Sequence, residues 1–253
     1  VSSTPPTATP TMDFDSHVEH DGPEFELAMR ITEAIRTANG RAVFVGGWVR
    51  DHLSGRKSKD IDLEVYGLTA EALRSVLERI GRVDTVGENF TVYKIGPLDV
   101  SLPRRESKTG RGHRGFTVTG DPDLSLDEAA RRRDFTINAI AWDPFADEYL
   151  DPYKGRDDLA RGILRLVDSE TFGDDSLRVL RAVQFAARFD LTMDGMTQAT
   201  CRTIPLDDLP PERIWGEVEK LLLRSARPSI GFTLALQIGV VDRLFPELQA
   251  LVG

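Results

Sequence analysis

The stretch of sequence that decides the fold is residues 42–51, which read AVFVGGWVRD. Its first four residues are rich in β-forming side chains and predict a short strand. Gly46 and Gly47 follow, and two glycines let the backbone turn sharply and let a phosphate approach the amide N–H groups. The next residues predict a helix, whose N-terminus favours negative charge. A glycine pair after a strand is more often only a turn, so a phosphate site needs a second signal.

The second signal is a pair of acids, Asp60 and Asp62, at the start of a β-rich run over residues 61–66. Alternate residues of a strand point to the same face, so the two carboxylates converge. They repel each other unless a cation lies between them, and hard Mg²⁺ prefers oxygen ligands. Asp99, in a β-rich run over residues 98–102, is placed to join them. A solvated strand end also explains an isolated Asp-x-Asp, but three carboxylates beside a glycine turn are typical of two-metal phosphoryl transfer.

The surrounding residues predict a mixed α/β domain over residues 23–167. Phe25, Leu27, Ile31 and Ile35 recur at roughly helical spacing, and Asn39-Gly40 marks the end of that helix. Further strands are predicted over residues 83–86 and 91–95, and further helices over residues 49–53 and 70–80. The pattern is that of a small sheet with interleaved helices.

Residues 168–253 show a different pattern, in which long helical periodicities replace the β-rich runs. Helices are predicted over residues 176–189, 211–223 and 229–244. We expect residues 168–253 to form a second, helical domain. Residues 1–22 are rich in Ser, Thr and Pro and then in acids, which is typical of a disordered tail.

Two further stretches combine arginines with carboxylates. Residues 131–138 read RRRDFTIN, and arginine suits bidentate binding of phosphate. Residues 173–181 read GDDSLRVLR, in which Asp174, Arg178 and Arg181 fall on one side of a predicted helix. In isolation, a solvated basic turn and an exposed i,i+4 ion pair are the simpler explanations. The functional alternative is that a carboxylate and a guanidinium present hydrogen-bond acceptors and donors to the edge of a nucleobase.

Composition and charge exclude several classes of protein. The single cysteine, Cys201, excludes a disulfide scaffold and a cysteine zinc cluster, and it suits a reducing cytoplasm. The longest uncharged apolar run is the 14 residues 228–241, fewer than the roughly 20 that span a bilayer. Residues 1–26 carry six acids and no Lys or Arg, so the net charge of −9 conceals a nearly balanced remainder. Within it, residues 104–114 hold five cations and one acid, a local positive patch.

Five motifs in this order resemble those of the class II tRNA nucleotidyltransferases, or CCA-adding enzymes, and of the closely related bacterial poly(A) polymerases. They are Gly-Gly-x-Val-Arg-Asp, Asp-x-Asp, Arg-Arg-Asp-Phe-Thr-Ile-Asn-Ala, Asp-Asp-x-x-Arg-Val-Leu-Arg-Ala and Pro-Glu-Arg-Ile-x-x-Glu. The resemblance covers about residues 40–250. It implies an α/β (α+β) polymerase-β-like nucleotidyltransferase head followed by an all-α neck domain.

The resemblance also implies the roles of individual residues. Asp60 and Asp62 are expected to hold Mg²⁺, and Asp99 is expected to complete the catalytic carboxylates. The residues expected to bind the nucleotide are Gly46, Gly47, Arg50, Arg133, Asp134, Asn138, Asp175, Arg178 and Arg181. In the family, the neck residues read CTP and ATP by hydrogen bonds, so no template is needed. The cations expected to contact RNA are Arg104, Arg105, Lys108, Arg111 and Arg114.

The implied reaction is attack of the 3′-hydroxyl of a tRNA on the α-phosphate of CTP or ATP, with release of pyrophosphate, in the cytoplasm. Three related activities are alternatives: addition of A alone, of CC alone or of a poly(A) tract. A further alternative is a nucleotide- or RNA-binding module that catalyses no reaction. The sequence indicates no membrane, and no protein partner can be inferred from it.

The sequence departs from the family at several positions. Asp174 stands where Glu is frequent, and Ser176 stands where Pro is frequent. Gln184 stands where an arginine commonly contacts the nucleotide, which leaves that contact open. Family members continue past Leu248 into a body and tail or an HD domain, so we expect this chain to be truncated. RNA would then be held by the basic loop and the neck.

Overall fold

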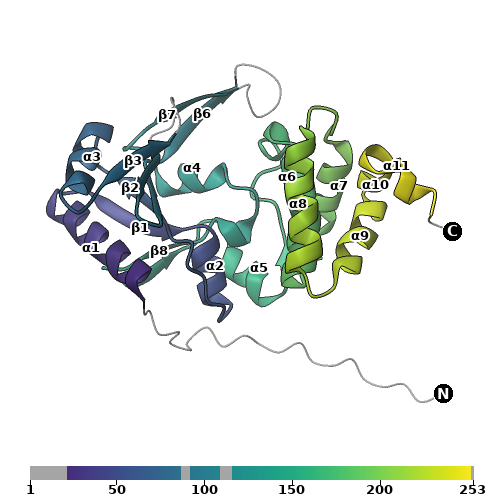
Figure 1. The fold of residues 1–253 in the computed structure, drawn as a ribbon, viewed down its shortest axis with the longest axis horizontal. Helices are drawn as coiled ribbons and strands as arrows, with labels where there is room; N and C mark the ends of the chain where they lie inside the picture. The colour runs from purple at the N-terminus through teal and green to yellow at the C-terminus, as the bar shows by residue number, and fades with distance from the viewer. Residues whose placement is uncertain (1–21, 87–91, 109–115, 252–253) are drawn as a thin grey trace, which may run out of the picture.

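The computed structural model describes residues 22–86, 92–108 and 116–251 (Figure 1). These ranges do not include residues 1–21 of the predicted tail, nor Arg111 and Arg114 of the predicted RNA patch. The elements that position the candidate site occur in the following order: α1 (Pro23–Thr37), β1 (Arg41–Val45), α2 (Gly47–Leu53), β2 (Asp62–Tyr66), α3 (Ala70–Glu78), β3 (Val83–Val86), β4 (Val92–Ile95), β5 (Leu98–Ser101), β6 (Arg104–Lys108), β7 (Phe116–Gly120), α4 (Leu126–Arg131), η1 (Thr136–Asn138), β8 (Ala141–Asp143), β9 (Glu148–Leu150), α5 (Gly155–Ala160), β10 (Ile163–Leu164), η2 (Phe172–Asp174), α6 (Leu177–Phe189), β11 (Thr192–Met193), α7 (Gly195–Thr203), α8 (Pro211–Arg224), α9 (Pro228–Gln237), α10 (Val240–Leu244) and α11 (Pro246–Gln249).

A seven-stranded sheet in the order β3-β4-β5-β2-β1-β8-β9 forms the centre of the N-terminal part. β2 runs parallel to β5, and the other neighbouring strands of this sheet pair antiparallel. In this register Asp62 on β2 lies directly beside Asp99 on β5. The sheet therefore brings together two of the three acids that the sequence predicts to meet.

An aromatic cluster fixes the start of α2 against the sheet. Trp48, the second residue of α2, packs with its ring centroid 4.8 Å from that of Phe44 on β1. Trp142 on β8 lies 5.2 Å from Phe44, and Phe25 on α1 lies 5.7 Å from it. Because Trp48 follows Gly47 directly, its burial in this cluster holds the glycine turn at the end of β1.

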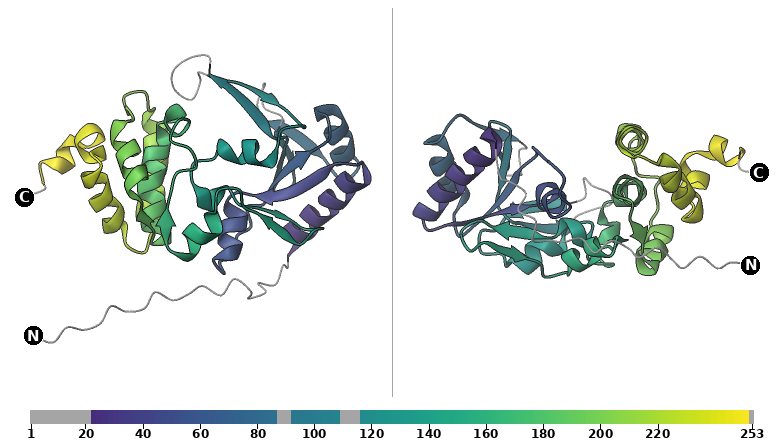
Figure 2. Two further views of the ribbon diagram at one scale, coloured as in Figure 1. Left: turned by 180° about the vertical axis from the view of Figure 1, so that it is seen from behind. Right: turned by 90° about the horizontal axis from the view of Figure 1, so that it is seen from below.

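The helices from α6 to α11 gather at the end of the molecule opposite α1 and α3, as both views in Figure 2 show. The predicted apolar stripe of α6, formed by Leu180, Val183 and Ala187, is buried. The helix predicted over residues 229–244 is instead two helices, α9 and α10, because Gly239 adopts φ 72° and ends the first one. Among the described residues, no helix is both long and apolar enough to cross a membrane.

The two parts of the chain are joined by a continuous apolar contact. Phe135, which follows the arginine cluster, has its ring centroid 5.7 Å from that of Phe172 and 5.6 Å from that of Phe185 on α6. The short strands β10 and β11 also pair in parallel across this junction. These contacts hold α6 against the end of the sheet where the glycine turn and the acids lie.

Candidate active site

A pocket of about 680 Å³ lies between the glycine turn, the β2 end of the sheet and the helices α6 and α8. All the residues predicted to bind the nucleotide line it, and so do Asp60 and Asp62. Asp99 is not among the lining residues. The pocket is also lined by residues to which the sequence assigned no role: Asp51, Lys57, Ser58, Lys59, Leu177, Phe185, Arg188, Arg213 and Arg224.

The glycine turn places backbone directly beside the acids. Gly46 has φ 72°, a left-handed conformation that favours glycine. A Cβ atom at this position would lie 3.4 Å from Oδ2 of Asp62 and 3.5 Å from Nη1 of Arg133. Gly46 therefore keeps open the space between the predicted metal ligand and a predicted phosphate-binding cation.

The carboxylates at the end of β2 and β5 repel one another. The pocket walls limit the bulk water around Asp62, and this desolvation, with the charges of Asp99 and Asp60, raises its pKa to about 6. Asp99 is also paired with Lys94, whose Nζ lies 2.8 Å from Oδ1. Within the described residues, no group of three or more acids, His or Cys is arranged to hold a metal ion. The fit of a cation therefore rests on Asp60 and Asp62, whose repulsion it would relieve.

Arg50 is buried and its guanidinium is fully engaged by neighbouring side chains. Its Nη2 lies 2.7 Å from Oδ1 of Asp51, and its Nη1 donates to Oδ1 of Asn138 at 2.6 Å. The guanidinium also lies over the ring of Phe189, 4.2 Å from its centroid. Burial lowers the pKa of Arg50 despite the neighbouring Asp51 carboxylate. In this arrangement Arg50 ties α2 to η1 and α6.

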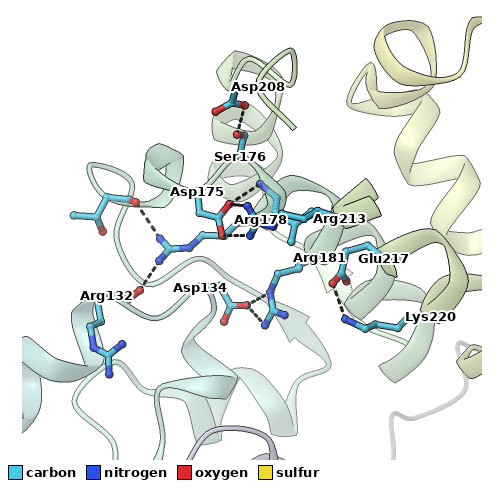
Figure 3. Close-up of polar contacts among 12 residues, drawn as sticks. Arg132, Asp134, Asp175, Ser176, Arg178, Arg181, Asp208, Arg213, Glu217 and Lys220 are labelled. Carbon is cyan, nitrogen blue, oxygen red and sulfur yellow. Dashed lines mark hydrogen bonds and ion pairs between the residues drawn. The ribbon is translucent and has the colours of Figure 1, made fainter. Parts of the chain in front are cut away.

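Asp134 is buried between the arginine cluster and α6 (Figure 3). Its Oδ2 accepts a hydrogen bond from Nε of Arg181 at 2.8 Å and lies 2.6 Å from Nη2 of the same guanidinium. Its Oδ1 accepts from Nδ2 of Asn138 at 2.9 Å and from the backbone N–H of Phe135 at 2.8 Å. Burial alone would raise the pKa of Asp134, but Arg181 and these hydrogen bonds outweigh it and lower the pKa.

Glu64, to which the sequence assigned no role, partly neutralises the arginine cluster. It is buried on β2, where its Oε1 accepts from Nη2 of Arg132 at 2.7 Å and its Oε2 lies 3.6 Å from Nη2 of Arg133. Burial would raise the pKa of Glu64, but the two guanidinium groups and the hydroxyl of Tyr66 lower it. The sequence pattern could have identified Glu64, because Asp60, Asp62 and Glu64 alternate along the chain and so point to one face of the strand.

The two acids of the motif at residues 173–181 lie outside the helix α6. α6 begins at Leu177, so Asp174 and Asp175 precede it and do not share a helical face with Arg178. Both carboxylate oxygens of Asp175 accept from Arg213 on α8, at 3.1 and 2.9 Å (Figure 3). Arg178 instead donates to the carbonyl oxygens of Thr171 and Arg132, at 2.9 and 2.5 Å. Asp175 and Arg178 thus line the pocket from fixed positions.

Gln184 does not lie in the pocket. It is buried in the interface of α6 with α8 and α9, where it lines a separate small cavity together with Glu217. Gln184 therefore contributes to the helix interface and not to the wall of the pocket. The pocket itself keeps Arg178, Arg181 and Arg188 on the facing side of α6.

The predicted RNA patch begins on a β-hairpin. Arg104 and Arg105 start β6, which pairs antiparallel with β7. Arg105 is neutralised by acids that the sequence pattern did not associate with it: its guanidinium lies 3.0 Å from Oδ2 of Asp121 and 3.9 Å from Oε1 of Glu128. Lys108 ends β6, and only its backbone is described. Arg105 is therefore not the free cation that the sequence suggested.

Comparisons with known proteins identify the family. Residues 42–165 match the family model described as the poly(A) polymerase head domain, and residues 195–251 match the one described as the probable RNA and SrmB-binding site of polymerase A. The chain is 42% identical over 216 residues to a multifunctional CCA protein of Nitrosococcus oceani, covering 83% of this chain and 51% of that protein. It spans about half the length of the curated relatives it matches.

Solved structures that resemble this chain are also CCA-adding enzymes. The CCA-adding enzyme of Thermotoga maritima in complex with tRNA matches with a TM-score of 0.73 at 27% identity, over 90% of this chain and 54% of that one. The CCA-adding enzyme of Bacillus stearothermophilus in complex with CTP matches with a TM-score of 0.71 at 30% identity, over 85% and 52%. The predicted fold class, a polymerase-β-like head followed by a helical neck, is confirmed. The chain belongs to the family of CCA-adding tRNA nucleotidyltransferases and bacterial poly(A) polymerases.

Proposed function

We propose that this protein is a template-independent tRNA nucleotidyltransferase, which adds CMP and AMP from CTP and ATP to the 3′ end of tRNA and releases pyrophosphate. The observation that carries the proposal is the single pocket in which the glycine turn, the Asp60 and Asp62 pair and the Asp175 and Arg178 pair lie together. The relatives solved in complex with tRNA and with CTP support these substrates.

The acid pair is the proposed catalytic centre. Asp60 and Asp62 would hold Mg²⁺, because their oxygens suit a hard cation and a cation would relieve the repulsion between them. Burial, together with the charges of Asp99 and Asp60, raises the pKa of Asp62. Bound there, the ion supplies charge neutralisation for the triphosphate and for the attacking 3′-hydroxyl. Asp99, one strand away, is proposed as the third carboxylate of the centre and adds negative charge beside Asp62. The 3′-hydroxyl attacks the α-phosphate, and pyrophosphate leaves.

Base selection is proposed to depend on Asp175 and Arg178. A carboxylate only accepts hydrogen bonds, and a guanidinium only donates them. Cytosine and adenine both carry an exocyclic amino group beside a ring nitrogen acceptor, so the pair suits both bases. Uracil and guanine place a carbonyl oxygen where the amino group would be, which leaves Asp175 without a donor. The fixed positions of both side chains support selection without a template.

The proposed function also assigns roles to the two domains and to further residues. We propose residues 23–167 as the head domain and residues 168–253 as the neck, since the apolar contact around Phe135 joins them at this boundary. Gly46 and Gly47 are proposed to receive phosphate oxygens, and Arg50, Arg133, Asp134, Asn138 and Arg181 to form the wall that holds the nucleotide. The protein is proposed to act in the cytoplasm, and Arg104, Arg105, Lys108, Arg111 and Arg114 are proposed to contact RNA.

The experiment that tests the function uses tRNA that lacks its 3′-terminal CCA, Mg²⁺ and each labelled nucleotide in turn. We expect CTP to be incorporated first and ATP only after it, with no incorporation from UTP or GTP. Asp62→Asn should abolish incorporation, because the ligand loses its charge. Asp84→Asn, which changes an exposed acid on β3 outside the pocket, is the matched control and should remain active.

The products decide among the alternatives. A long tract made from ATP alone would identify a poly(A) polymerase, and addition of A or CC alone would identify a specialised enzyme. Binding of CTP without any incorporation, or full incorporation by Asp62→Asn, would contradict the proposed reaction.

A further inference from the structure

Glu64 is a buried carboxylate that the proposed reaction does not use. It lies on β2, two residues after Asp62, and is 2% exposed. β2 is a central strand, and Glu64 is paired with Val43 on β1 and with Ser101 on β5. The backbone of Glu64 is therefore fixed on both sides. Burying a carboxylate is unfavourable unless charges and hydrogen bonds compensate for the lost water, so its partners are essential to it.

One of these partners is Arg132, the residue that follows α4. Oε1 of Glu64 accepts from Nη2 of Arg132 at 2.7 Å, and the two side chains are only 3% and 20% exposed. A hydrogen bond between two charged groups is stronger than one between neutral groups, and the protein interior strengthens it further. The bond therefore ties the C-terminal end of α4 to the centre of the sheet.

The backbone of Arg132 makes a contact in the other direction, toward the neck. Its carbonyl oxygen accepts from Nη2 of Arg178 at 2.5 Å, and Figure 3 shows its side chain pointing away from Arg178. Nη1 of Arg178 donates to the carbonyl oxygen of Thr171 at 2.9 Å. Both of these contacts are to backbone oxygens, so the position of the guanidinium depends on what holds each segment of backbone. On the side of the head, Glu64 holds Arg132.

Two other contacts in this region do not replace that bond. Arg131, one residue earlier, pairs with two acids, but its side chain is 51% exposed and exposed ion pairs contribute little. The hydroxyl of Tyr66 donates to Oε2 of Glu64 at 2.9 Å, which is the other oxygen of the carboxylate. Removing either contact leaves the bond between Glu64 and Arg132 in place.

We propose that Glu64 is a positioning residue for base selection, which acts through Arg132 on Arg178. We call these two successive contacts the Glu64 relay. This inference rests on the proposed function, in which Arg178 donates a hydrogen bond to the base. Glu64 itself does not line the pocket, so its effect on the base is indirect. The relay holds the base-reading guanidinium in a fixed position relative to β2, the strand that carries Asp62.

The test measures the affinities of the intact protein for CTP and for UTP by calorimetry, without tRNA, and takes their ratio. The two nucleotides carry the same phosphates, so the ratio cancels any change in triphosphate binding through Arg133, the other arginine beside Glu64. Glu64→Gln should lower the preference for CTP over UTP by about tenfold, the equivalent of one charge-assisted hydrogen bond. Arg132→Gln should have the same effect, because it removes the other partner of that bond.

A double variant distinguishes a relay from two independent effects. If Glu64 acts through Arg132, the variant with both substitutions should also lose about tenfold, whereas independent effects would multiply to about 100-fold. Tyr66→Phe and Arg131→Gln are the matched controls, because they alter the same region but keep the bond between Glu64 and Arg132. Both controls should keep the ratio of the wild type within about twofold.

An unchanged ratio in both single variants would overturn the relay, even with a lower melting temperature, because Glu64 would then only stabilise the fold. A loss of about 100-fold in the double variant, or an equal loss in Tyr66→Phe, would also overturn it. So would equal affinity of the wild type for CTP and UTP, since Arg178 would then select no base.

If Glu64→Gln does not fold, Arg132→Gln gives the ratio by itself, because the side chain of Arg132 is the more exposed of the two. Failure of the proposed function would appear separately. The wild type would then incorporate no nucleotide into tRNA, whereas the ratio of CTP to UTP affinity needs no turnover.

Discussion

Arg213 is predicted to control nucleotide selection without touching the reacting atoms. It holds both oxygens of Asp175, and Oδ1 of Asp175 also accepts from the backbone N–H of Leu177 at 3.2 Å. Oδ1 therefore has two donors, and Oδ2 keeps a lone pair for an amino group of the base. Arg213→Gln would release the carboxylate, so its orientation toward the base would no longer be fixed.

The size of the effect follows from the exposure of the pair. The side chains of Arg213 and Asp175 are both 29% exposed, between a surface ion pair worth up to about 1 kcal/mol and a buried one whose disruption costs about 3–5 kcal/mol. We therefore expect Arg213→Gln to destabilise the protein by about 1–2 kcal/mol. Because the same contact orients the carboxylate toward the base, we expect a similar energy to be lost from base selection. About 1–2 kcal/mol corresponds to a decrease of about 5- to 30-fold in the preference for CTP over UTP.

The assay measures kcat/KM for CTP, ATP, UTP and GTP with tRNA lacking its 3′ end, together with the melting temperature. Arg227→Gln is the control, because Arg227 pairs with Asp190 where both side chains are more than 60% exposed. It should change neither discrimination nor stability by more than about 1 kcal/mol. If Arg213→Gln lowers the melting temperature but leaves the nucleotide preference intact, the contact only ties α6 to α8 and the reasoning is refuted.

Two further predictions concern the glycine turn and the acid pair. Gly46→Ala should destabilise the protein by about 1–2 kcal/mol, because alanine strains a left-handed backbone, and it should weaken CTP binding; an unaltered melting temperature would contradict this. In the metal-free protein, Asp62 should titrate with a pKa of about 6, measurable by NMR. Since that pKa is raised, its contribution to stability is present at low pH and is lost as the pH rises through about 6. Asp99→Asn should lower the pKa of Asp62, because it removes a like charge; no change would show that Asp99 does not contribute and that burial and Asp60 raise the pKa.

The order of strands and helices around the site was predictable because each element has a local signature. β1 and α2 flank a glycine pair, and the β-rich run at residues 61–66 alternates acids with buried apolar residues. Local periodicity did not predict the helix boundaries where a single residue changed the direction of the backbone. Gly239 divides the predicted final helix in two, and Asp174, which the pattern placed on one side of a helix with Arg178, precedes the helix that begins at Leu177.

The sequence by itself determined the family, the glycine turn, the acid pair and the set of residues predicted to bind the nucleotide, because these follow from motifs of adjacent residues. Only the tertiary structure decided which charged side chains pair with one another. Asp175 finds Arg213, Arg181 finds Asp134 and Arg132 finds Glu64, at separations of 38, 47 and 68 residues. Such pairs form when packing brings distant elements together, and no local periodicity records them. Burial of Gln184 depends on the same long-range packing.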